Sequence, residues 1–268
     1  MIGSKSKRNQ VRNSVLNPKA KSKIWFLSWL DVSAIAAWGI LMLRYWLSGK
    51  LNLLIHPDYF WLVISGGFGL LIVAGSKAWD LLRRRRPLNN TTGQHITLFP
   101  PGFSSGILLI TALIGLVFTP RVFASQTAIQ RGVTEFLGAT RSQPQAFRSS
   151  RRPEERSLLD WVRTLNVYPE PDAYTGQKVK VQGFVIHPTE FAADYMLISR
   201  FVITCCAADA YPVGLPVKLA QNRQAYQPDT WLEVEGTMIT ANLAGKRQLT
   251  IQATSLTQIS EPENPYEY

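Results

Sequence analysis

Three apolar runs constrain this 268-residue chain more than any other feature. They cover residues 24–47, 59–82 and 103–119. A helix needs about 20 mostly apolar residues to cross roughly 30 Å of hydrocarbon, so the first two runs meet the requirement and the third lies near its lower limit. Aromatic side chains gather near the ends of the first two runs, as interfacial anchors do. The pattern predicts three transmembrane helices within residues 24–119, preceded by a basic tail at residues 1–23.

The lysines and arginines in the connecting segments predict how these helices are oriented. The N-terminal tail contains seven, the loop after the first run contains only Lys50, and the loop after the second contains Lys77 and the run Arg83 to Arg86. Because cytoplasmic loops carry an excess of Lys and Arg, the tail and the second loop are expected in the cytoplasm. Three crossings then place residues 120–268 outside it. We expect a multi-pass protein of the plasma (inner) membrane with an extracytoplasmic C-terminal domain.

The net charge of +11 is divided unevenly along the chain. Residues 1–156 carry 21 Lys and Arg against 6 Asp and Glu, whereas residues 157–268 carry 8 against 12. The basic excess therefore flanks the apolar runs, which is typical of membrane orientation rather than of a nucleic-acid surface. We expect the membrane as a partner and no nucleic acid.

Two polar residues near the apolar runs are candidates for contact with a partner or a substrate. Asp31 lies inside the first run, where an ionisable group is costly unless it is hydrated near the headgroups or faces a partner helix or a polar cavity. Hydration is the favoured interpretation, because the residue lies close to the expected cytoplasmic end. His56 precedes the second run, on the same side of the membrane as the expected C-terminal domain.

The C-terminal part of the chain has the pattern of a small β-domain. Residues 120–156 are rich in Arg, Ser and Gln and are expected to form a linker. Residues 157–268 begin with a helical pattern and continue with period-two runs at 178–186, 195–205, 213–219, 231–240 and 247–259. Five such strands favour an OB-like small barrel over a short β-sandwich. The predicted fold class is therefore an α-helical membrane anchor of three transmembrane helices joined to an all-β, OB-like, extracytoplasmic small barrel.

The chain has only two cysteines, and they are adjacent: Cys205 and Cys206. Neighbouring Cα atoms lie about 3.8 Å apart, below the roughly 4.4–6.8 Å of an ordinary disulfide. Three alternatives remain: buried packing residues, which the high burial of free cysteine favours, contact with a soft metal ion, or thiol redox chemistry including a strained vicinal disulfide. A turn after the strand would bring Asp209 to the thiols, and His187 is the nearest imidazole candidate in the sequence. No other cofactor is indicated.

Three strings of this sequence resemble a known family. They are GKLNLLIHP at residues 49–57, SQTAIQRG at 125–132 and RFVITCCAADA at 200–210. They resemble a bacterial family of two-component permease subunits, each with a three-helix membrane anchor and a C-terminal CCxADA-containing domain of unknown function. The resemblance implies a larger partner permease, similar to methylarsenite-type efflux proteins, and implies no particular substrate.

The sequence lacks a nucleophile–base set, a phosphate-binding loop and a motif of paired carboxylates. We therefore expect a protein that is not an enzyme but an accessory subunit of a membrane permease or efflux complex. Its external β-domain would contact the substrate or the permease. The alternative is a membrane-anchored, extracytoplasmic module for thiol-dependent metal binding or redox chemistry.

Overall fold

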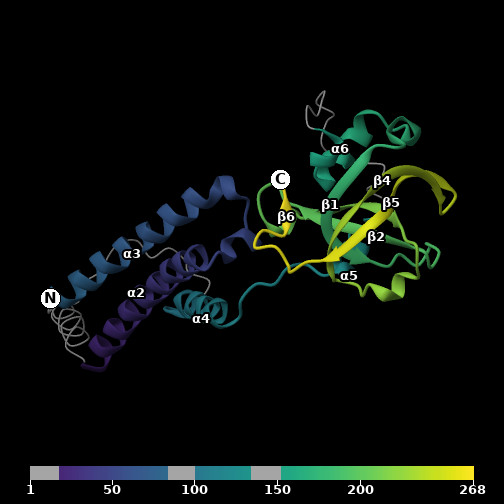
Figure 1. The fold of residues 1–268 in the computed structure, drawn as a ribbon. Helices are drawn as coiled ribbons and strands as arrows, with labels where there is room; N and C mark the ends of the chain where they lie inside the picture. Colours follow the sequence, from purple (N-terminus) through teal and green to yellow (C-terminus); the bar gives the residue numbers. More distant parts are fainter. Residues whose placement is uncertain (1–17, 84–99, 134–151) are drawn as a thin grey trace, which may run out of the picture. The chain divides into compact units, whose positions relative to one another are not determined.

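The computed structural model describes residues 18–83, 100–133 and 152–268. Residues 1–17 of the basic tail, most of the arginine run and much of the expected linker lie outside these residues, whereas residues 18–23 of the tail belong to the first helix. The chain divides into two compact units, coloured along the sequence in Figure 1. Of the described residues, the helical unit comprises 18–51, 58–83 and 100–120, and the β unit comprises 52–57, 121–133 and 152–268.

Three helices make up the helical unit, with α2 (Pro18–Leu47) packed against both α3 (Phe60–Arg83) and α4 (Phe103–Val117). The short 3-10 helices η1 (Lys50–Leu53) and η2 (Pro57–Tyr59) follow α2. Two helices, α2 and α3, are long and apolar enough to cross a membrane, judged by length and composition alone. The third expected span forms an apolar helix of only 15 residues, which is about 22 Å long at 1.5 Å per residue.

Glycines allow the three helices to approach closely. A Cβ atom added to Gly39 of α2 would lie 3.0 Å from the carbonyl oxygen of Gly67 in α3. A Cβ atom added to Gly115 of α4 would lie 3.0 Å from the side chain of Leu41 in α2. Small residues at such crossings let backbones pack closely, as in membrane helix pairs.

Large apolar side chains cover much of the outer surface of the helical unit. Ile72 of α3 is 71% exposed and Val117 of α4 is 74% exposed. Other exposed members of this set include Trp25, Ile40, Leu47, Trp61, Phe68, Leu108 and Ile110. Such a surface is far more apolar than that of a typical soluble monomer.

The β unit contains a six-stranded sheet. Its strands are β1 (Lys178–Ile186), β2 (Tyr195–Val202), β3 (Tyr211–Lys218), β4 (Trp231–Leu243), β5 (Lys246–Gln258) and β6 (Tyr266–Glu267). The strand order is β1-β4-β5-β3-β2-β6, and an additional β1–β2 pairing joins the first five strands into a closed ring of pairings. Only the β3–β5 and β2–β6 pairs are parallel. Five of the strands match the predicted runs, while the two-residue β6 was not expected.

Two glycines permit the bending that this ring requires. Gly183 lies where β1 changes partner, since residues up to 184 pair with β4 and residues 184–186 pair with β2. A Cβ atom there would lie 2.5 Å from the carbonyl oxygen of Ser199. Gly236 adjoins a register shift between β4 and β5, and a Cβ atom there would collide with the carbonyl group of Gln252. Both positions require glycine because another backbone passes too close for a side chain.

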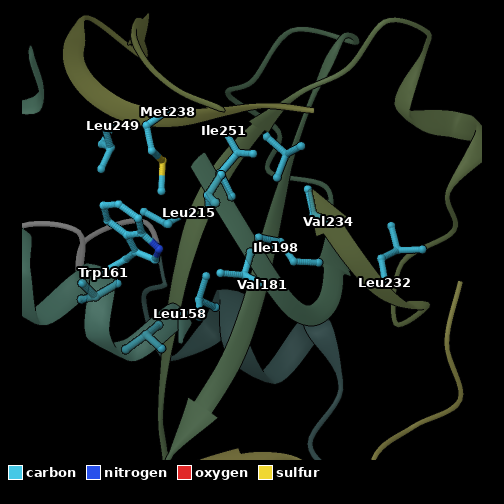
Figure 2. Close-up of a cluster of buried hydrophobic side chains, with 14 of the residues drawn as sticks. Leu158, Trp161, Val181, Ile198, Leu215, Leu232, Val234, Met238, Leu249 and Ile251 are labelled. Atoms are coloured by element: carbon cyan, nitrogen blue, oxygen red, sulfur yellow. The ribbon is translucent and has the colours of Figure 1, made fainter. Parts of the chain in front are cut away.

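Helix α6 (Leu158–Val167) packs against the strands and contributes to the larger hydrophobic cluster. Ser157 and Asp160 begin it with a capping box, in which each side chain accepts a hydrogen bond from the other residue's backbone N–H. Its apolar face carries Trp161, which is fully buried. In Figure 2, Trp161 points into the cluster toward Met238 of β4 and Leu215 of β3.

A second hydrophobic cluster joins the ring to residues that were expected to form a linker. Ala128 of α5 (Ser125–Gln130) and Val133 are buried there with Phe184 of β1 and Phe201 of β2. Residues 121–133 therefore belong to the β unit instead of forming an open tether. Residues 134–151 of the expected linker lie outside the described part of the chain.

Candidate functional site: the thiol turn

Both cysteines lie in a turn between β2 and β3, here called the thiol turn (residues 203–209). Strand β2 ends at Val202, three residues before the predicted end, and the turn closes through η6 (Ala207–Asp209). The Asp209 carboxylate accepts hydrogen bonds from the N–H groups of Thr204 and Cys205, at 3.3 and 2.8 Å, and from the Thr204 hydroxyl, at 2.7 Å. Aspartate often closes turns in this way, by replacing the backbone partners that a strand would offer.

The turn brings the two thiols together and toward solvent. Their Sγ atoms lie 3.6 Å apart, and both cysteines are free. Cys205 is exposed and Cys206 is half-buried. Consecutive side chains of a regular strand point to opposite faces, so a continued strand would have separated them. The exposure of Cys205 contradicts the interpretation of the pair as buried packing residues.

Charge at the turn keeps Cys205 protonated. The Asp209 carboxylate and then the Cys206 thiol raise the pKa of Cys205 to about 11. Partial burial favours a higher pKa for Asp209, but the hydrogen bonds from Thr204 and Cys205 outweigh it and lower that pKa to about 2. At neutral pH the turn therefore holds a carboxylate beside a neutral Cys205 thiol, which is a weak nucleophile in this form.

A segment from far away in the sequence pairs with the thiol turn. Residues 52–57, here called the 52–57 segment, belong to the β unit although they lie between α2 and α3 in the chain. Ile55 and Cys206 form an antiparallel bridge. The His56 N–H donates to the Cys205 carbonyl at 3.0 Å, and the Ala207 N–H donates to the Leu54 carbonyl at 2.8 Å. Sequence reasoning missed this contact, because one bridge leaves no periodic signal.

The C-terminal residues support the same region. Strand β6 runs beside the end of β2, and the Ile203 N–H donates to the Glu267 carbonyl. The Tyr266 hydroxyl donates to the Leu53 carbonyl at 3.2 Å, and burial raises the pKa of Tyr266 to about 12, so the hydroxyl remains a donor. The Tyr268 ring meets the His56 ring edge-on at 4.5 Å between centroids. His56, predicted as a contact residue, therefore lies beside the thiol turn.

The other predicted site residues lie elsewhere. His187 adjoins the loop that contains Arg223 and Tyr226, and burial lowers its pKa. Asp31 accepts a hydrogen bond from the Ser105 hydroxyl of α4, so it faces a neighbouring helix, the alternative to hydration near the headgroups. Within residues 18–83, 100–133 and 152–268, no group of three or more His, Cys, Asp or Glu side chains is arranged to hold a metal ion. The turn thus presents two thiols but no larger ligand set in the described structure.

The raised pKa of Cys205 gives a direct prediction. In a Cys206→Ser background, Asp209→Asn removes the negative charge that disfavours the Cys205 thiolate and keeps an oxygen acceptor for the turn. The thiolate fraction at pH 8 should increase, and alkylation by N-ethylmaleimide should become about tenfold faster. Glu190→Gln in the same background removes an exposed carboxylate elsewhere and should leave the rate unchanged. Equal rates with and without Asp209 would contradict this electrostatic account.

Comparison with known families finds a match in the C-terminal part of the chain. Residues 154–268 match the family model described as the DUF1980 C-terminal domain. This match spans α6, all six strands and the thiol turn. No curated protein matches the chain.

Proposed function

We propose that this chain is an accessory subunit of a membrane permease or efflux complex, with an external β-domain that contacts the substrate or the permease. One observation carries the proposal: the 52–57 segment pairs with the thiol turn. The sequence between these two parts contains α3 and α4. The 52–57 segment and the thiol turn belong to one unit and therefore lie on the same side of the membrane. If α3 crosses the membrane, the chain must cross it a second time before Arg121.

The short helix α4 has features that suit this return crossing. Its last carbonyl groups lack partners within the helix, and such groups are costly in hydrocarbon. The Arg44 guanidinium donates to the Leu116 carbonyl at 2.9 Å, and the Tyr45 hydroxyl donates to the Gly115 carbonyl. Arg44 also places positive charge at the negative end of the α4 dipole. Residues 118–120 follow without helical structure and extend the reach by about 10 Å.

The surface of the helical unit supports a membrane location. Its exposed apolar side chains, such as Ile72 and Val117, would be unfavourable in water and are favourable in lipid. Together with the lysine and arginine distribution, this surface supports the proposal of a three-crossing topology in the plasma (inner) membrane. The N-terminus is then cytoplasmic, and the β unit and the 52–57 segment are extracytoplasmic.

We also infer that the closed ring of strands is an OB-type barrel. Its circular order β1-β2-β3-β5-β4, with β3 and β5 parallel, is the Greek-key arrangement of that fold. OB barrels that bind nucleic acids use a basic groove with exposed aromatic rings. Residues 157–268 carry 8 basic and 12 acidic side chains, which favours a different ligand.

A partner permease is supported by where the family-like strings lie. Residues 52–57 of the first string pair with the third string at the thiol turn. In the second string, the Arg131 guanidinium donates to the Ala210 carbonyl of the third and stacks over Phe123. Parts of all three strings, widely separated in the sequence, therefore meet around one turn. We call the parts of the three strings that meet here (residues 52–57, Arg131 and the thiol turn with Ala210) the shared surface. Such a surface is suited to recognising one partner.

Affinity purification from native membranes tests the proposal. The full chain, tagged and extracted in mild detergent, should elute with a larger multi-pass permease. Arg131→Ala, which removes a contact within the shared surface, should reduce recovery of the permease. Lys180→Ala, on an exposed strand position paired with Glu233 and Glu235, should not. Elution as a lone monomer, with unchanged cellular ion content after gene deletion, would contradict the proposal.

The 3.6 Å separation of the thiols favours a second candidate, an anchored module for thiol-dependent metal binding or redox chemistry. Two adjacent thiolates suit a soft ion such as Cu(I), which tolerates low coordination numbers. Titration of the full chain with Cu(I) should then show tighter binding than titration of a Cys205→Ser/Cys206→Ser variant. Identical binding curves would remove metal binding as a function of the pair.

A further inference from the structure

We propose that Cys205 and Cys206 form a dithiol–disulfide site that reacts with disulfides, and that its oxidation releases the 52–57 segment from the thiol turn. This inference goes beyond the accessory function and does not require a partner permease. It rests on the positions of the two thiols and of the backbone groups beside them.

The thiols are placed for reaction with each other. Their Sγ atoms are already 3.6 Å apart, and a disulfide bond is about 2.05 Å long, so the sulfurs need to approach by roughly 1.5 Å. Cys205 is exposed, which gives an external disulfide access to the pair. The Asp209 carboxylate disfavours an anionic Cys205 but does not oppose a neutral disulfide.

Closing the ring must disturb the peptide that joins the two residues. Adjacent Cα atoms are about 3.8 Å apart, closer than the roughly 4.4 Å at which ordinary disulfides begin. The bond therefore forms only if the Cys205–Cys206 peptide twists from its present geometry. Strained, exposed disulfides of this kind are easily reduced again, which is characteristic of regulatory sites.

That same peptide holds the 52–57 segment. The Cys205 carbonyl accepts the His56 N–H, and Ala207, which follows Cys206, donates its N–H to the Leu54 carbonyl. These two hydrogen bonds make up the antiparallel bridge between Ile55 and Cys206. A twist at the Cys205 carbonyl turns it away from His56 and breaks the bridge. The Tyr266–Leu53 hydrogen bond does not involve the thiol turn and can persist.

The chemical step is thiol–disulfide exchange. One cysteine, as its thiolate, attacks an external disulfide RSSR to give a mixed disulfide and one RSH. The second cysteine then attacks the mixed disulfide, forms the Cys205–Cys206 bond and releases a second RSH. The cysteine pair loses two electrons and two protons. The electrons reduce RSSR, and the protons are taken up by the two RSH molecules that form. The structural consequence of this oxidation is the release of the 52–57 segment, which connects α2 to α3, from the thiol turn.

Mass spectrometry of the full chain in detergent micelles tests both parts of this proposal. The protein is equilibrated with oxidised glutathione at pH 8, and its intact mass and amide hydrogen exchange are then measured. We expect the loss of two hydrogen atoms and about tenfold faster exchange in peptides covering residues 52–57 and 205–207, with α6 unchanged. Dithiothreitol should reverse both changes.

Cys206→Ser provides the matched control, because it retains the exposed thiol but cannot form the ring. It should acquire a glutathione adduct without faster exchange in the 52–57 segment. If the native protein also gives only glutathione adducts or intermolecular disulfides, the dithiol site is overturned. If it loses two hydrogen atoms while exchange in both peptides stays constant, the coupling to the 52–57 segment is overturned. Neither result would affect a permease partnership measured by co-purification.

Discussion

Replacing Trp161 with alanine is expected to lower the free energy of unfolding of the β unit by about 4 kcal/mol. Trp161 is fully buried in α6, and its ring meets the Tyr174 ring edge-on at 6.2 Å between centroids. Truncation would leave a cavity between α6 and the strands, because the surrounding backbone can close around it only in part. Pulse proteolysis of the full chain in detergent and urea, following the C-terminal fragment, measures the loss.

Two variants separate the loss of core packing from the loss of a hydrogen bond and from the loss of an exposed ring beside the same helix. The Trp161 Nε1 atom is buried without a hydrogen-bond partner in the described structure, so Trp161→Phe loses volume but no hydrogen bond. We expect it to cost about 1–2 kcal/mol. Tyr168→Ala removes an exposed ring just after the same helix and should change stability by less than about 0.5 kcal/mol. A loss below about 1 kcal/mol for Trp161→Ala would show that α6 does not belong to the core.

Replacing Arg200 with alanine should have the second-largest effect, a loss of about 3 kcal/mol. Arg200 forms an ion pair with Glu267 at 3.6 Å, and both side chains are largely buried. Its guanidinium also donates to the carbonyl groups of Asn264, Pro265 and Tyr266. Without Arg200, the buried Glu267 carboxylate loses this ion-pair partner, although it still accepts hydrogen bonds from Ser157 and Leu159 at the start of α6.

The exposed ion pair of Arg247 with Glu170 and Asp172 provides the comparison. Arg247→Ala should cost less than about 1 kcal/mol, because solvent screens exposed charges. The double variant Arg200→Ala/Glu267→Gln should be more stable than the sum of the single losses predicts, because it removes the uncompensated charge. Equal losses for Arg200→Ala and Arg247→Ala, measured by the same proteolysis, would show that the buried pair does not hold the C-terminal strand in place.

The regular elements of this fold could be predicted because each leaves a periodic or compositional signal. Apolar runs predicted α2, α3 and α4, and the alternation of apolar and polar residues predicted β1 to β5. The end of β2 was misplaced because the apolar run continues to Cys205, whereas the Asp209 carboxylate closes a turn there.

The parts of the site that could not be predicted depend on long-range contacts. The proximity of Cys205, Cys206 and Asp209, by contrast, could be predicted, because a turn after the strand brings these three residues together. The bridge from Ile55 to Cys206 joins residues about 150 positions apart, and β6 is only two residues long. Neither forms a pattern in a sequence window. His187 follows β1 beside the start of β2, because Ile186 pairs with Leu197, whereas the thiols follow the end of β2. This register depends on long-range pairing and leaves no local signal in the sequence.

Labelling of the native cysteines tests the central claim, that the β unit lies outside the cytoplasm. The chain contains only Cys205 and Cys206, and Cys205 is exposed, so any labelled thiol reports the position of the thiol turn. A charged, membrane-impermeant thiol reagent is applied at pH 8 to intact spheroplasts expressing the full chain. A Ser4→Cys variant in a Cys205→Ser/Cys206→Ser background reports the N-terminal tail. We expect the native protein to be labelled without permeabilisation and the tail variant only after it; the opposite pattern would contradict the proposed topology.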